Sequence, residues 1–138
     1  MDLNQLILTG ERRLFFLEGP ADSGKSALLG RLPPEKTEFI SMEEYRQEMV
    51  AALGAEAEDP TAVFLAGLLE RHPGEVLCLE DADRELEGKL SAQVSFARHL
   101  QVLALSRRVV VTGTELDRRC PELFTALDPA CYEYYALV

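Results

Sequence analysis

The sequence lacks the features that mark secreted, membrane-spanning and disulfide-stapled proteins. It has no apolar run near the roughly 20 residues that cross a bilayer, and residues 1–8 contain no basic region or cleavage-like segment. Its three cysteines, Cys78, Cys120 and Cys131, are odd in number and lack the spacing of a metal site. These absences predict a reduced, cytoplasmic protein without a membrane contact.

Basic residues are also scarce. The chain has 14 Lys and Arg against 24 Asp and Glu, a net charge of −10 and a pI of about 4.6. Bulk binding of nucleic acid or anionic membranes needs a basic surface, so the composition argues against both. With 138 residues, 47% of them apolar, and no internal repeat, we expect residues 1–138 to form a single domain with a buried core.

Residues 19–26 read GPADSGKS and match the phosphate-binding pattern G-x-x-x-x-G-K-[ST]. In such a loop, backbone N–H groups surround the phosphates, the lysine reaches the β- and γ-phosphates, and the last hydroxyl binds Mg²⁺. The alternative is an ordinary strand–helix turn with an exposed lysine. The predicted nucleotide-binding residues are Gly19, Pro20, Ala21, Asp22, Ser23, Gly24, Lys25 and Ser26.

Strand and helix patterns alternate along the whole chain. Apolar runs predict strands at 14–17, 37–40, 75–79, 108–112 and 132–138. Helices are expected from Lys25 to the Pro33-Pro34 stop, over 42–53, over 60–71, over 90–105 and over 121–127, with Ser41 and Asp59 as N-caps. This alternation predicts an α/β protein: a three-layer P-loop NTPase fold with a parallel five-stranded sheet and helices on both faces.

Two further strands end in candidate catalytic residues. VLCLEDAD, residues 76–83, has the form of a Walker B motif, in which Glu80 approaches the metal together with Ser26 and Asp81 polarises the attacking water. VVVTGTE, residues 109–115, offers Thr112 or Thr114 to the γ-phosphate and the water. The alternatives are helix-capping acids in the first case and a polar loop in the second.

Together these segments resemble the AAA+ module of the bacterial replication initiator DnaA over residues 10–138. The resemblance rests on the P-loop, on TEFISMEEYRQEMVAAL with its Ser41-Met42-Glu43-Glu44-Tyr45 helix start, on VLCLEDAD and on VVVTGTELDRR. It implies an ATP-binding domain that uses Mg²⁺. It also implies a truncated module, without the family's helical lid and its DNA-binding helix-turn-helix domain.

The chain departs from this family at three places. Glu80 stands where the family usually has Asp, and Thr114 stands where its polar sensor is commonly acidic. No arginine occurs near Asp128-Pro129-Ala130, where the family places its trans-acting arginine finger. Because such a finger stabilises charge on the transferring phosphoryl group, we expect slow, Mg²⁺-dependent hydrolysis by the chain alone.

The leading hypothesis is therefore a DnaA-like ATP-binding domain with weak or partner-dependent ATPase activity. It would bind ATP and ADP, serve as a nucleotide-dependent regulator or protein partner in DNA replication, and make no direct contact with nucleic acid. Three alternatives stay open. The first is an active small ATPase with Arg118 or Arg119 as its arginine finger. The second is a superfamily 3 helicase, because GPADSGKS also resembles the P-loop of that family. The third is an interaction module that binds no nucleotide.

Overall fold

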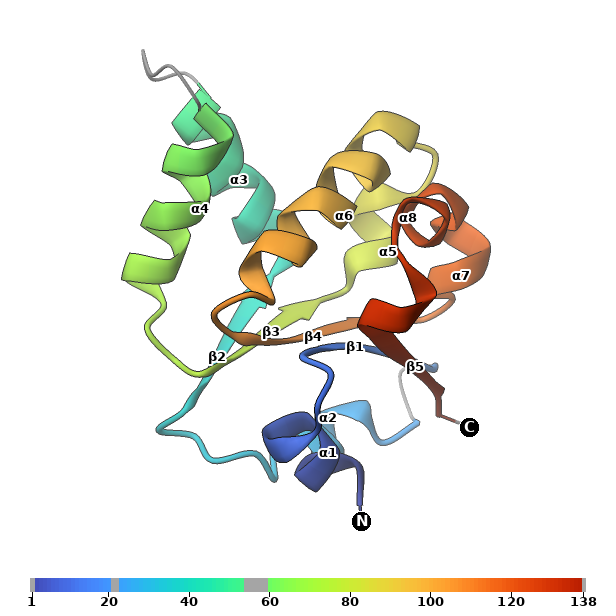
Figure 1. Cartoon of the computed structure of the whole chain (residues 1–138). Helices are drawn as coiled ribbons and strands as arrows, with labels where there is room; N and C mark the ends of the chain where they lie inside the picture. The colour runs from blue at the N-terminus through green and yellow to red at the C-terminus, as the bar shows by residue number, and fades with distance from the viewer. Residues whose placement is uncertain (1, 21–22, 54–59, 138) are drawn as a thin grey trace.

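A parallel sheet lies between two layers of helices (Figure 1). The structure is a computed structural model that describes residues 2–20, 23–53 and 60–137. The five strands follow one another in space as β2-β3-β4-β1-β5, and every neighbouring pair is parallel. They are β1 Leu14–Glu18, β2 Thr37–Ser41, β3 Val76–Glu80, β4 Arg108–Gly113 and β5 Tyr132–Ala136.

The helices divide unequally between the two faces of the sheet. The described helices are α1 Leu3–Thr9, α2 Lys25–Leu29, α3 Met42–Leu53, α4 Pro60–Arg71, α5 Ala82–Leu86, α6 Leu90–Leu103, α7 Leu116–Arg119, α8 Pro121–Ala126 and the 3₁₀ turn η1 Pro129–Cys131. Figure 1 shows α1 and α2 below the sheet and α3 to α8 above it. The predicted α/β fold with a five-stranded parallel sheet covered on both faces is confirmed.

Successive strand residues point to opposite faces, and both faces are buried. On β1, Leu14 and Phe16 belong to the large core under α3 to α8, whereas Phe15 and Leu17 belong to the smaller core under α1 and α2. This double burial explains why the strand sequences are continuously apolar. Cys78 is fully buried on β3 in the smaller core, so it acts there as a small hydrophobe.

The long elements lie where the sequence predicts them. Helix α3 begins directly after Ser41, whose Oγ accepts a hydrogen bond from the Glu44 backbone N–H at 3.1 Å, as the capping pattern requires. Helix α6 ends at Leu103 and α8 at Ala126, both within two residues of the prediction. The expected Asp59 cap of α4 and the Val138 end of the last strand lie outside the described residues.

The short elements differ from the prediction. Helix α2 ends at Leu29, before the Pro33-Pro34 stop, and 3₁₀-like bonds such as Leu32 N–H to the Leu29 carbonyl continue the turn beyond Gly30. Glycine at position 30 weakens a helix because it loses the most backbone freedom on ordering. Helices α1, α5 and α7 are not predicted from the sequence. Helices α5 and α7 are too short to display a helical period, whereas α1 shows one turn of it in Leu3, Leu6 and Ile7.

None of the helices in the described part of the chain has the length and apolar character needed to cross a membrane.

Candidate nucleotide site

The predicted site residues lie at one edge of the sheet. Because all strands are parallel, their carboxyl ends meet there, and ligands of open α/β sheets bind outside these ends. The central strand β1 leads into the loop 19–26, and β3 ends at Glu80. Strand β4 lies between β1 and β3 in the sheet. The end of β4, with Thr112 in it and Thr114 just after it, is therefore placed between the loop after β1 and the acids after β3.

The loop after β1 has the backbone form that its glycines allow. Gly24 has a φ of +91°, a left-handed conformation that favours glycine, and α2 begins at the next residue. A Cβ on Gly19 would lie 2.7 Å from the Leu137 carbonyl oxygen, so a side chain there would collide with backbone. The Ser23 N–H donates to the Pro20 carbonyl at 3.0 Å and closes the turn. Ala21 and Asp22 lie outside the described residues.

The Lys25 ammonium ties this loop to β4. Its Nζ donates to the Gly19 carbonyl oxygen and, at 3.0 Å, to the Gly113 carbonyl oxygen. The Gly19 N–H donates to the same Gly113 carbonyl at 3.1 Å. Lys25 is half-buried and Ser26, in the first turn of α2, is exposed. The amine therefore lies at the mouth of the loop, held by carbonyl oxygens that a phosphate can replace.

The acid pair follows β3. Burial, and in second place the charge of Asp81, raises the pKa of the Glu80 carboxyl. Asp81 is exposed and adopts a left-handed φ of 62°, which makes it the one described non-glycine residue with a positive φ. Aspartate tolerates this conformation better than most residues, and such angles cluster at functional sites.

The end of β4 separates the roles of the two threonines. Thr112 is buried, and its Oγ1 accepts a hydrogen bond from the Asp81 N–H at 3.3 Å. Thr114 is exposed, and its backbone N–H donates to Asp83. Thr112 therefore supports the turn that carries the acid pair, while the side chain of Thr114 stays available to solvent.

Asp83 is a site residue to which the sequence analysis gave no role. Its side chain is almost fully buried, and its Oδ2 accepts the backbone N–H groups of Thr114 at 2.9 Å and Glu115 at 2.8 Å. The Arg84 N–H donates to its other oxygen at 3.0 Å. Asp83 thus fastens the start of α5 to the loop after β4. The sequence signal for this role was the third acid of VLCLEDAD. A carboxylate so close to a buried strand is itself easily buried, and it then needs hydrogen-bond donors.

The two finger candidates on α7 have different surroundings. Arg118 has a side chain that is 77% exposed and pairs with Glu115. Arg119 is more enclosed, with its guanidinium 4.0 Å from Asp83 Oδ2 and from Glu87 Oε1. Arg119 is therefore turned toward this chain's own acidic groups, whereas Arg118 would have to leave Glu115 to reach another molecule.

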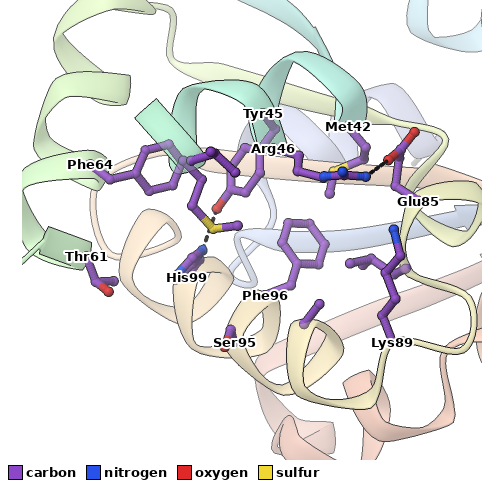
Figure 2. Close-up of a pocket in the computed structure, with 14 residues that line it drawn as sticks. Met42, Tyr45, Arg46, Thr61, Phe64, Glu85, Lys89, Ser95, Phe96 and His99 are labelled. Carbon is purple, nitrogen blue, oxygen red and sulfur yellow. Dashed lines mark hydrogen bonds and ion pairs between the residues drawn. The ribbon is translucent and has the colours of Figure 1, made fainter. Parts of the chain in front are cut away.

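Several hollows open on the side of the sheet that carries α3 to α6, and two of them are relevant here. A small one of about 250 Å³ lies over the acid pair and includes Ser41, Glu43 and Arg84, so it places a basic side chain beside Glu80 and Asp81. A larger one of about 440 Å³ lies between α3, α4 and α6 (Figure 2). Its wall contains a buried hydrogen bond of 2.8 Å between the Tyr45 hydroxyl and His99 Nδ1. Burial lowers the pKa of His99 and raises that of Tyr45, so both groups are neutral at pH 7.

Comparison with known proteins identifies the fold. No protein-family model and no curated protein sequence matches the chain. A solved structure described as the replication initiator DnaA bound to AMPPCP and single-stranded DNA aligns with a TM-score of 0.62 and 17% identity, over 96% of this chain and 43% of that one. Domain III of the Thermotoga maritima replication initiation protein DnaA aligns with a TM-score of 0.62 and 16% identity, over 99% of this chain and 59% of that one.

A third structure, AMPPCP-bound DnaA from Aquifex aeolicus, aligns with a TM-score of 0.55 and 17% identity over 92% of this chain and 40% of that one. The chain therefore spans between 40% and 59% of the length of these three structures. At such identities the likeness defines the fold alone. The chain shares its fold with these DnaA structures: a five-stranded parallel sheet with helices on both faces, as the sequence resemblance implied.

Proposed function

We propose that this domain binds ATP together with Mg²⁺ at the loop 19–26 and hydrolyses it slowly unless a partner protein assists. One observation supports this more than any other. Lys25 bonds the end of β4 through Gly113, and Thr112, at the same end of β4, bonds the Asp81 turn after β3. Hydrogen bonds thus connect Lys25, which we propose binds phosphate, to the acid pair through the end of β4. An ordinary strand–helix turn would not require such a connection.

In this proposal the loop supplies the phosphate contacts. The Lys25 ammonium exchanges the Gly19 and Gly113 carbonyl oxygens for phosphate oxygens, and backbone N–H groups of the loop donate to the same phosphates. Helix α2 has 5 residues, so its dipole adds little and the lysine carries most of the attraction. The glycines at 19 and 24 keep side chains out of this space.

The donor set near the loop fits Mg²⁺. This ion prefers hard oxygen ligands and takes few of them from protein when phosphates supply the rest. The Ser26 hydroxyl and the Glu80 carboxylate are the residues that would hold it, and it would neutralise phosphate charge. A nearby cation also compensates the repulsion between Glu80 and Asp81 that raises the pKa of Glu80.

Hydrolysis needs an oriented water and compensation of charge on the phosphoryl group. We assign the first task to Asp81, whose exposed carboxylate accepts a proton from the attacking water. Thr114 is the candidate for contact with the γ-phosphate, since Thr112 is committed to the Asp81 amide. Residues 120–138 contain no arginine, so the second task falls to another molecule. The resulting ATPase is slow.

We further propose that the protein acts in DNA replication, as a nucleotide-dependent regulator or as a protein partner. Two of the aligned DnaA structures hold AMPPCP, an ATP analogue, and one of these also holds single-stranded DNA. This chain has a net charge of −10, which opposes direct binding of nucleic acid and favours a protein partner. Its cysteines are free wherever the structure describes them, as suits a reducing cytoplasm.

Steady-state hydrolysis of ATP tests the catalytic half of this proposal. An arginine finger contributes roughly 10³–10⁵ in rate in related systems, or about 4–7 kcal/mol, so the purified chain should turn over far more slowly than about one ATP per second. Asp81→Asn should lower the residual rate and leave ATP affinity nearly unchanged. Arg118→Ala should have no effect on a chain that acts alone.

A turnover above about one per second, and its loss in Arg118→Ala, would contradict the proposal. That result would favour the active, self-assembling ATPase, in which the exposed Arg118 of one copy acts on the nucleotide of another. Equal rates in wild type and Asp81→Asn would show instead that the acid pair does not act on water.

A further inference from the structure

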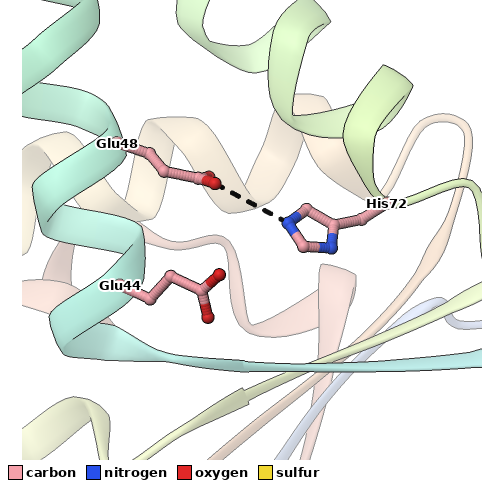
Figure 3. A group of neighbouring side chains, drawn as sticks. All are labelled: Glu44, Glu48 and His72. Atoms are coloured by element: carbon pink, nitrogen blue, oxygen red, sulfur yellow. Dashed lines mark ion pairs between the residues drawn. The ribbon is translucent and has the colours of Figure 1, made fainter.

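Away from the nucleotide site, three metal-binding side chains converge between α3 and the end of α4 (Figure 3). Glu44 and Glu48 are one helical turn apart on α3, and His72 follows the last residue of α4. One ligand atom from each residue lies within 4.8 Å of the others. Two elements distant in sequence thus aim an imidazole and two carboxylates at one point.

Buried polar atoms at this point have no hydrogen-bond partner among the described residues. They are Glu48 Oε2 and His72 Nε2, both inaccessible to solvent. His72 Nε2 lies 3.8 Å from Glu48 Oε1, too far for a hydrogen bond. Buried donors and acceptors are normally satisfied, and a site for a bound ion is one of the usual reasons for an exception.

The other ring nitrogen of His72 faces a third carboxylate. His72 Nδ1 lies 3.7 Å from Glu38 Oε2, on β2. Metal-bound histidines commonly donate their second N–H to a carboxylate, which fixes the tautomer and leaves the opposite nitrogen free to bind metal. Glu38 lies on the outer side of the His72 ring and the two α3 carboxylates on its inner side. At 3.7 Å the Glu38 contact is longer than a hydrogen bond, so Glu38 would have to move closer to the ring to orient it.

We propose that Glu44, Glu48 and His72 Nε2 form a zinc site that fastens α3 to α4, with Glu38 orienting the histidine. Nitrogen and carboxylate oxygen are ordinary Zn²⁺ ligands, and three protein ligands leave one position for water. Bond lengths near 2.1 Å require ligand atoms roughly 3.4 Å apart in a tetrahedron. The ligand atoms now lie up to 4.8 Å apart. Small rotations of the Glu44 side chain, which is exposed, and the Glu48 side chain, which is half-buried, would bring them to this distance.

Arg71 is the competitor for this site. Its Nη2 lies 3.3 Å from Glu48 Oε2 without forming a hydrogen bond, and its side chain is 51% exposed. The guanidinium can move into solvent when a divalent cation arrives. Without a metal, the same residues would form only a polar cluster, in which the His72 ring lies between Glu38 and Glu48.

Calorimetric titration of the full chain with Zn²⁺ separates these two arrangements. The zinc site predicts one equivalent bound at micromolar Zn²⁺, and no such binding in His72→Gln or Glu48→Gln. Glu38→Gln should weaken binding about 10- to 100-fold, as expected for a carboxylate that orients a ligand. Glu43→Gln is the matched control, because it removes the same charge from the neighbouring position on α3, and it should bind like wild type.

The two histidines of the chain provide an independent readout by NMR. Zn²⁺ should shift the ring signals of His72 and leave those of His99, which is hydrogen-bonded to Tyr45, unchanged. Absence of binding at micromolar Zn²⁺, binding that survives in His72→Gln, or equal loss in Glu43→Gln and Glu48→Gln would each overturn the proposal. None of these measurements requires ATP, so their outcome is independent of the proposed nucleotide site.

Discussion

At the scale of single residues, the strongest constraint near the site is Asp83. A buried carboxylate that accepts three backbone N–H groups both satisfies those donors and neutralises its own desolvation cost. The sequence could not distinguish it from Asp81, two positions earlier, since both follow the same strand. Only the fold decides which acid points into the protein and which into solvent.

Asp83→Ala should lower the free energy of unfolding by about 2–4 kcal/mol, because it leaves the Thr114 and Glu115 N–H groups without their acceptor. Urea unfolding measures the difference. Asp117→Ala removes an exposed aspartate from the neighbouring α7 and should change stability by no more than about 0.5 kcal/mol. Equal effects of the two substitutions would mean that Asp83 is not the fastening residue described above.

His99 makes stability depend on pH on the acid side of neutrality. Its pKa in the folded chain is lowered by burial, so the unfolded chain binds a proton more readily. As pH falls below about 6.5, the ordinary histidine pKa, the unfolded state gains protons and the folded state loses stability, until the lower folded pKa is reached. His99→Gln cannot titrate but retains an acceptor for the Tyr45 hydroxyl.

We therefore expect the free energy of unfolding to fall less steeply between pH 7 and pH 5 in His99→Gln than in wild type, when both are followed by urea unfolding. The many carboxylates titrate alike in both proteins, so the difference in slope isolates His99. Parallel pH profiles would indicate that the histidine is not buried in its neutral form.

At the scale of elements, the residue that precedes α2 has a left-handed backbone conformation, which favours glycine. Gly24 has a φ of +91° and nothing lies within 4 Å of a Cβ placed on it, so the cost of a side chain there is conformational rather than steric. Gly24→Ala should destabilise the chain by roughly 1–2 kcal/mol. Gly24→Asn should cost less, because asparagine tolerates left-handed angles. Urea unfolding that ranks Asn below Ala would contradict this reading.

Elements with a clear period were predictable from the sequence, and those without one were not. The buried run from Leu14 to Leu17 and the capped helix after Ser41 carry signals of several residues, and both are confirmed. Helix α1 has an Asp2 cap, which accepts the Gln5 N–H at 2.9 Å, and one turn of apolar residues, Leu3, Leu6 and Ile7, a signal too brief to be noticed without its packing partners. Short helices such as α5 and α7 depend on contacts like those of Asp83, which arise only after the sheet has formed.

The site follows the same division. The loop motif and the acid pair could be predicted because their spacing is fixed by local chemistry. The bond from Thr112 to Asp81 and the convergence of Glu44, Glu48 and His72 depend on strand order and helix packing. The assignment of residues 19–26, Glu80, Asp81 and Thr114 to a nucleotide site stays a prediction, and Ala21 and Asp22 also lie outside the described residues.

At the scale of the whole molecule, the proposed phosphate-binding loop belongs to a chain that is acidic overall. A net charge of −10 leaves Lys25 and the loop amides as a local exception to the overall field. Affinity for ATP must therefore come from the loop itself together with Mg²⁺, which reduces the charge of the nucleotide. Removal of Mg²⁺ should weaken binding more than an equal change of ionic strength.

The melting temperature with and without saturating ATP and Mg²⁺ tests the central claim most directly. At about one hundred times the Kd, binding adds roughly 2.7 kcal/mol of stability, which raises the melting temperature of a domain of this size by roughly 9 °C. Lys25→Ala should abolish the rise and remain folded, whereas Lys36→Ala, an exposed lysine outside the loop, should retain it. No rise for the wild-type chain with millimolar ATP and Mg²⁺, or the same rise in Lys25→Ala, would contradict the account.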